Sequence, residues 1–116
     1  MDRLAEAMRS HNLTKTRALF DAQHMGSQFM DNLPAAYDYY ESFEPFYRIL
    51  SAAPNADGTG TIVADFSLDA TPRQQDLPAR RRHANLRVQV ALVRAASGAS
   101  QWRIVALDPA NVLFEF

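Results

Sequence analysis

Hydrophobic residues near the N-terminus recur three or four positions apart, a spacing that places them on one face of a helix. Leu4 and Met8 have this spacing within a first predicted helix over residues 2–9. Asn12 precedes a second predicted helix over residues 13–21, and it suits an N-cap because its side-chain oxygen can accept a free backbone N–H. The chain is therefore expected to begin with at least two short amphipathic helices.

A third helical segment is predicted where hydrophobic residues are spaced by four, at Met25, Phe29, Leu33 and Tyr37. Pro34 falls inside this segment, although proline lacks a backbone N–H and its ring clashes with the preceding turn. We therefore expect a break or kink near residues 31–33, or a new helix that starts at Pro34.

The segment 37–50 is compatible with two structures. A helical face fits the spacing of Phe43, Phe46, Tyr47 and Leu50. Strand alternation fits a different set, Tyr39, Phe43, Tyr47 and Ile49. The density of aromatic residues and Pro45 favour an extended strand with an irregularity, because proline is tolerated at sheet edges and bulges.

After a turn at residues 54–58 the hydrophobic period changes from about four to two, which is typical of strands. Alternation predicts strands over residues 61–70 and 82–95, joined by a long exposed connection, and a last strand over 101–107 after a loop at 97–100. A one-residue slip at this loop would reverse the faces of Trp102 and Ile104, and the pattern leaves both registers open.

Composition narrows the classes of partner. The 116 residues suffice for one domain with its own core, and 47% of them are hydrophobic. Twelve basic and thirteen acidic residues give a net charge of −1, so we expect no nucleic-acid partner. The uncharged apolar stretches are far shorter than a membrane span, so we expect no membrane insertion. The chain has no cysteine, which excludes disulfides and cysteine nucleophiles. No signal-like segment is visible, and the cellular location stays open because a mature exported domain would look the same.

Helices followed by consecutive antiparallel strands predict an α+β domain, with helices packed on one face of a curved sheet of about four strands. The predicted helix at residues 12–20 and the strands at 86–92 and 102–107 resemble the nuclear transport factor 2-like superfamily, most closely its uncharacterised bacterial members. The resemblance covers nearly all of residues 1–116 and implies a single cone-shaped domain with two or three N-terminal helices. That superfamily includes dehydratases, isomerases and non-catalytic binding domains, so the fold alone does not determine the function.

Asp65, Asp69 and His83 are the best candidates for acid–base chemistry. In catalytic relatives an Asp/His pair inside the cone moves a proton, and the resemblance assigns these three residues that role only if they face the cone interior. Their alternation is opposite to that of the apolar residues, so a solvated face is the alternative. The corresponding function would be that of a small-molecule lyase or isomerase.

A non-catalytic binding domain is the favoured hypothesis, with a small apolar or carboxylate ligand, or a protein partner, in or around the cone. The predicted ligand-binding residues are Tyr39, Tyr40, Phe43, Tyr47, Phe66, Arg82, Leu86 and Val88. Arg82 would lie at the rim and attract a carboxylate. The alternatives are that the aromatic residues only cover the core and that residues 80–82 form surface ion pairs.

Two further expectations concern cofactors and assembly. His11 and His24 lack partners at metal-ligand spacing, and no nucleotide-binding or nucleophile motif is present, so we expect no metal and no cofactor. A homodimer through the second sheet face is expected, because Val63, Ala91 and Val93, with either Val105 or Ile104, would otherwise leave apolar surface in water.

Overall fold

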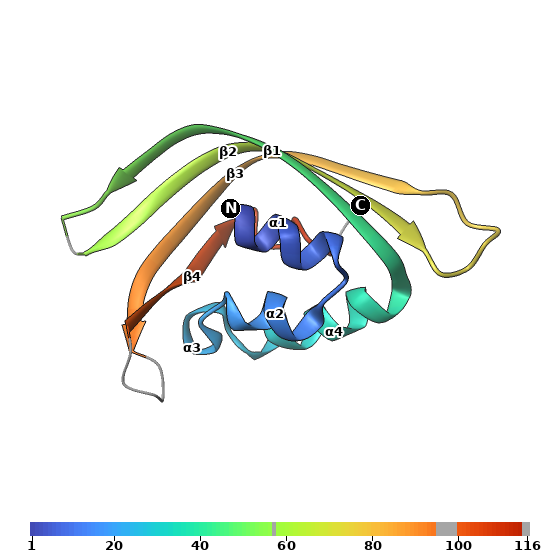
Figure 1. Ribbon diagram of the computed structural model, residues 1–116, viewed down its shortest axis with the longest axis horizontal. Coiled ribbons are helices and arrows are strands. Elements are labelled where there is room, and N and C mark those ends of the chain that lie inside the picture. Colours follow the sequence, from blue (N-terminus) through green and yellow to red (C-terminus); the bar gives the residue numbers. More distant parts are fainter. Residues whose placement is uncertain (57, 95–99, 115–116) are drawn as a thin grey trace.

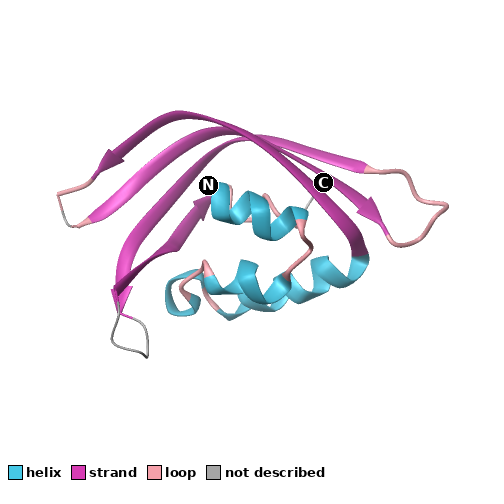
Figure 2. Ribbon diagram, viewed as in Figure 1, coloured by secondary structure: helices cyan, strands magenta, loops and turns pink. Residues whose placement is uncertain are grey.

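Four helices are followed by four strands in a computed structural model that describes residues 1–56, 58–94 and 100–114. The helices are α1 (Asp2–Arg9), α2 (Leu13–Ala18), α3 (Ala22–Met25) and α4 (Ser27–Tyr39), and the strands are β1 (Tyr40–Pro54), β2 (Thr59–Pro72), β3 (Arg80–Arg94) and β4 (Ser100–Asp108). The strands form one antiparallel sheet in the order β1-β2-β3-β4. This sheet arches over the helices, which lie on its concave side (Figures 1 and 2). The predicted α+β class is confirmed, with four helices where two or three were expected.

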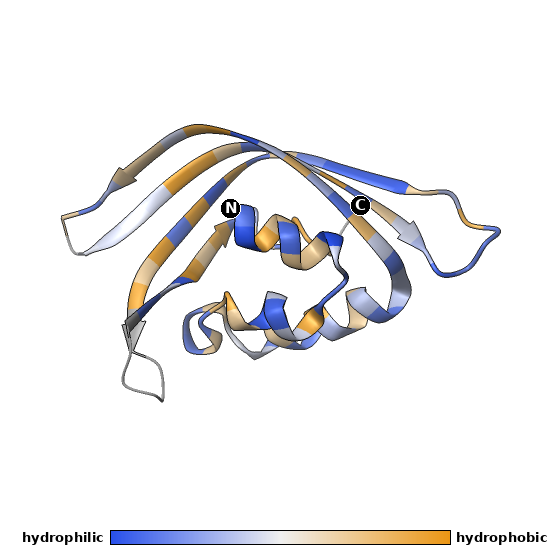
Figure 3. Cartoon of the chain, viewed as in Figure 1, coloured by the Kyte–Doolittle hydropathy of each residue, from blue (hydrophilic) through white to orange (hydrophobic). Residues whose placement is uncertain are grey.

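The core lies between the concave sheet face and the helices, and strand alternation determines which residues enter it. On β2, Ala64, Phe66 and Leu68 are almost completely buried, and the residues between them point to the other face. The same alternation of hydrophobic and hydrophilic residues is visible along the strands in Figure 3. Phe29 from α4 and Phe20, which follows α2 and forms a bridge with Ile104 of β4, belong to the same buried cluster.

A buried hydrogen bond joins α2 to α4 within this core. The Thr16 hydroxyl donates to the Asn12 carbonyl at 2.9 Å and lies 2.5 Å from the Tyr37 hydroxyl. Because the single Thr16 hydrogen is used by Asn12, Tyr37 is the donor in the second bond. Asn12 also caps α2, since its Oδ1 accepts the Lys15 backbone N–H at 3.0 Å, as the sequence predicts. Burial raises the pKa of the Tyr37 hydroxyl.

Neither a break before Pro34 nor a new helix starting at Pro34 is present, so these two expectations are wrong: α4 runs from Ser27 to Tyr39 with Pro34 inside it. Proline removes one helical hydrogen bond, and the burial of Leu33 and Tyr37 beside it provides the compensating packing. The ambiguous segment divides at Tyr40: residues 37–39 are helical and the rest form β1. This strand has two irregularities and lies at the sheet edge, as Pro45 predicts.

The register of β4, which the sequence leaves open, is determined by a bulge opposite Gln89 and Val90. Val90 is paired with Ile104, and Trp102 with Leu92, so both β4 side chains lie on the concave face. The predicted loop at residues 97–100 lies almost entirely outside the described residues.

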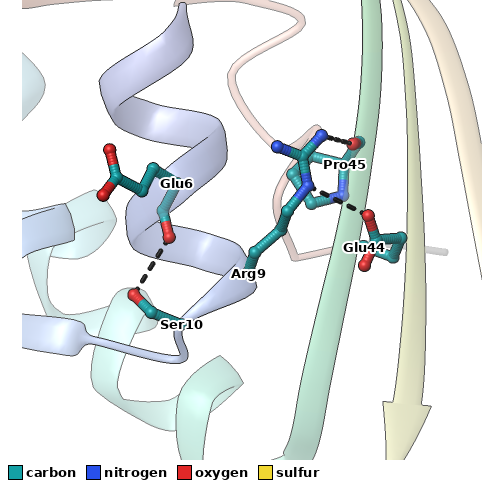
Figure 4. Close-up of polar contacts among 5 residues, drawn as sticks. All are labelled: Glu6, Arg9, Ser10, Glu44 and Pro45. Atoms are coloured by element: carbon teal, nitrogen blue, oxygen red, sulfur yellow. Dashed lines mark hydrogen bonds and ion pairs between the residues drawn. The ribbon is translucent and has the colours of Figure 1, made fainter.

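Both edges of the sheet are partly covered by backbone or side-chain contacts. On β4, Ile104 donates to the Leu19 carbonyl at 2.7 Å and accepts from the Asp21 N–H at 2.9 Å. On β1, Arg9 at the end of α1 donates to the Pro45 carbonyl at 2.8 Å and forms a 2.9 Å ion pair with Glu44 (Figure 4). Such contacts use edge groups that could otherwise pair with another chain. None of the helices within the described residues is both long and apolar enough to cross a membrane.

Candidate functional site

The three residues predicted as an acid–base set lie on the convex face of the sheet, away from the helices. Asp65 and Asp69 alternate with the buried residues of β2, and His83 lies opposite Ser67 on β3. The Nε2 of His83 donates to Asp65, and their side chains are 60% and 37% exposed. The structure therefore brings Asp65 and His83 together, but the condition that they face the cone interior is not met.

Asp69 belongs to a separate ion pair on the same face. Its two carboxylate oxygens accept from Nε and Nη2 of Arg81 at 2.5 and 2.9 Å. These hydrogen bonds hold the pKa of the Asp69 carboxyl below its usual value, so this group stays ionised at neutral pH. A proton-transfer group needs a pKa near the working pH and an apolar site, and this ion-paired surface supplies neither for Asp69.

Most of the predicted ligand-binding residues belong to the packed core. Phe43, Phe66, Leu86 and Val88 are at most 2% exposed. Tyr47 is half-buried against this core. Tyr40 is also a buried member of the core, and together with the half-exposed Tyr39 it lines a surface depression of about 410 Å³ beside α4. Ligand binding by these residues stays a prediction, and their packing shows a structural role for the five buried ones.

Arg82 occupies the concave face opposite Leu68, toward the start of β3. Its Nε is buried and has no hydrogen-bond partner among the described residues. The neighbouring Arg81 points to the opposite face and pairs with Asp69, so residues 80–82 do not act as one cluster.

At the other end of the sheet the strands extend past the start of α1 (Figure 1). An open apolar concavity lies there. Two adjoining depressions of about 430 and 300 Å³ share Ile62, Val90 and Trp102. We call their combined surface the concave groove; its walls also include Met1, Leu4 and Ile104 from one depression and Ala52, Pro54 and Gly60 from the other.

The side chains of the concave groove are apolar over most of its floor. Trp102 leaves 56% of its surface exposed, and Leu92 beside it on β3 leaves 53%. Gly60 allows close packing at this point, because a Cβ there would lie 3.2 Å from Cγ2 of Val90. Charged residues occur at the rim, where Asp2, Arg3 and Arg103 line the larger depression.

The sequence pattern placed Val90 on the apolar face but did not reveal that the groove is open. Alternation along β3 and β4 indicates which residues share a face. No local signal shows where α1 begins relative to the sheet, and Trp102 lies beside that start. Within the described residues no group of three His, Asp or Glu side chains could hold a metal ion.

Comparisons with known proteins identify the fold. No family model matches the chain, and no curated protein matches it significantly. A conserved protein from Planctomyces limnophilus superimposes with a TM-score of 0.70 at 12% identity, covering 91% of this chain and 85% of that one. A nuclear transport factor 2-like superfamily protein from Salmonella enterica gives 0.65 at 13% identity, covering 91% and 81%.

A third solved structure, from Novosphingobium aromaticivorans, is described as a "putative aromatic ring hydroxylase". It gives a TM-score of 0.61 at 11% identity and covers 92% of this chain and 80% of that one. Sequence identities this low show a shared fold but not a shared activity. The chain has the nuclear transport factor 2-like fold, because its helices pack on a curved antiparallel sheet and these three structures superimpose on it.

Proposed function

We propose that this protein is a non-catalytic binding domain that holds a small apolar molecule in the concave groove. The observation that carries this proposal is the exposure of Trp102 on the concave face, beside Ile62 and Val90. Large apolar side chains at the floor of a concave surface lose contact with water when a ligand covers them. Each depression has the volume of a small-ligand site, which is roughly 300–1,000 Å³.

Binding fits the groove better than catalysis does. Asp2, at the start of α1, is the carboxylate among its lining residues, and it is exposed to water. A general base for carbon acids requires an apolar environment that shifts its pKa, which an exposed carboxylate lacks. The lyase or isomerase alternative rests on Asp65, Asp69 and His83, whose side chains lie on the opposite face of the sheet.

Trp102 provides a direct measurement because it is the only tryptophan in the chain. We expect its fluorescence to shift to the blue when an aromatic or fatty acid from a small panel occupies the groove, because the ligand displaces water from the indole. Trp102→Ala should weaken binding of the same compound, measured by calorimetry, by roughly tenfold or more, since a buried aromatic contact is worth about 1.5–3 kcal/mol.

Two controls locate the site. Phe46→Ala removes a half-exposed aromatic side chain from the convex face and should leave the affinity unchanged. Arg82→Ala distinguishes ligand binding in the groove from ligand binding at the cone rim, the site predicted from the sequence, because Arg82 lies toward the other end of the sheet. If no compound of the panel shifts the fluorescence, ligand binding in the concave groove is refuted. If Arg82→Ala weakens binding and Trp102→Ala does not, the ligand binds at the rim beside Arg82 instead.

The convex sheet face is proposed as the contact between two copies of the chain. Val63 and Ala91 lie on this face and are partly exposed, whereas Ile104 is buried in the core and does not contribute. Their exposed apolar area favours self-association. Light scattering at micromolar concentration should give twice the mass of the chain, and Val63→Asp should give the mass of one chain. A wild-type monomer would contradict this proposal.

A further inference from the structure

A second depression lies outside the concave groove and is lined by charged as well as apolar residues. It has a volume of about 630 Å³ and lies where α2, the segment 20–23 and α4 meet β4. We call it the arginine pocket, after Arg17 and Arg103; Thr14, Asp21, Gln23 and Met30 also line it.

The two arginines reach this pocket from elements far apart in the sequence, α2 and β4. Neither forms an ion pair with a carboxylate anywhere in residues 1–56, 58–94 or 100–114. Two positive charges at one cavity repel each other, and a nearby anion relieves that repulsion.

A second, independent observation concerns the hydrogen bonds of Arg103. Its Nε is buried, and no described residue accepts its hydrogen. A buried donor of a charged group costs free energy when it lacks an acceptor. Arg103 also carries terminal N–H groups, and an oxyanion in the pocket would accept from these paired donors, which match two oxygens.

Asp21 is the negative group in the pocket, and its oxygens are already engaged. One oxygen accepts the Gln23 backbone N–H at 3.3 Å, and the other contacts Nδ1 of His24. Asp21 therefore serves as the N-cap of α3 and pairs with His24 instead of with an arginine. Two arginines against one carboxylate leave an excess of positive charge at the pocket.

We propose that the arginine pocket binds a small oxyanion, held by the guanidinium groups of Arg17 and Arg103. Thr14 and Gln23 line the same pocket, and a hydroxyl and a side-chain amide can both act as neutral donors. A phosphate group and a carboxylate share the required chemistry, since both present two oxygens to an arginine. This site does not depend on ligand binding in the concave groove, although Arg103 also lines that groove.

The test uses the ¹⁵N-labelled full chain, titrated with inorganic phosphate and, separately, with acetate at constant ionic strength. We expect saturable shifts of the arginine Nε–H resonances of Arg17 and Arg103. Arg17→Gln should weaken binding of the active anion roughly tenfold or more, because hydrogen bonds to charged groups are strong. Arg87→Gln is the matched control: it removes the same charge from an exposed position of β3.

Arg103→Gln should weaken binding as much as Arg17→Gln. If circular dichroism shows that Arg103→Gln is unfolded, the binding measured for Arg17→Gln decides the test, because Arg17 is exposed and its substitution leaves the core intact. Saturation with phosphate alone identifies a tetrahedral anion, and saturation with acetate alone a planar one; either supports the site. Shifts that do not saturate with either anion, or an equal loss in Arg87→Gln, overturn the proposal.

Discussion

Replacing Phe66 with alanine is expected to lower the free energy of unfolding by about 3–5 kcal/mol. Phe66 lies in the middle of β2 on the concave face and is 1% exposed. Its removal loses the transfer free energy of the aromatic ring and leaves a cavity among residues of both helices and sheet. Urea unfolding followed by circular dichroism measures the change.

Phe46→Ala is the matched control for this substitution. Phe46 lies on β1 one position from Tyr47, the partner of Phe66, but its side chain points to the convex face and is 49% exposed. The same change of residue should therefore cost less than about 1 kcal/mol. Equal losses in the two variants would show that the faces of β1 and β2 are wrongly assigned.

Thr16→Val is expected to lower the free energy of unfolding by about 1–3 kcal/mol, with little change in side-chain volume. The substitution leaves the Tyr37 hydroxyl buried without the acceptor that Thr16 supplies at 2.5 Å. Tyr37→Phe removes the hydroxyl itself, so it should cost less than Thr16→Val does. The double variant should be close in stability to Tyr37→Phe, because no buried donor then remains unpaired.

Alkaline pH tests the burial of the Tyr37 hydroxyl, which raises its pKa although the hydrogen bond with Thr16 lowers it. Burial raises the pKa of Tyr37 in the folded state, so the protonated hydroxyl stabilises the fold below its ordinary pKa of 10.0. This stabilisation should decrease as the pH rises above that value, and the decrease should be smaller in Tyr37→Phe. Additive losses from Thr16→Val and Tyr37→Phe would contradict a direct bond between the two side chains.

Much of the sheet could be predicted because one face of each central strand is buried. On β2, polar residues at every second position can lie only on the face that remains in water, which determines where Asp65 and Asp69 point. The Asn12 cap was also predicted correctly, because an N-cap depends only on residues within one helical turn. Elements with a strong local pattern were therefore predictable.

The errors and omissions have a common cause in tertiary structure. Pro34 is accepted inside α4 because the packing of Leu33 and Tyr37 outweighs a local preference. The face of the sheet on which Trp102 lies depends on a bulge that the residue pattern does not predict. The arginine pocket joins residues 17 and 103, whose contact depends on the whole fold. Periodicity describes which side of an element is apolar, but not which part of that side stays uncovered.

The place of Met1 has a practical consequence for the design of experiments. Its side chain forms part of the wall of the concave groove, next to Leu4 and Trp102. Any affinity tag fused ahead of this residue would begin at the entrance to the groove and could fold back over the indole. Tag removal before a titration therefore matters more for this protein than for one in which the tag joins the chain far from the binding surface.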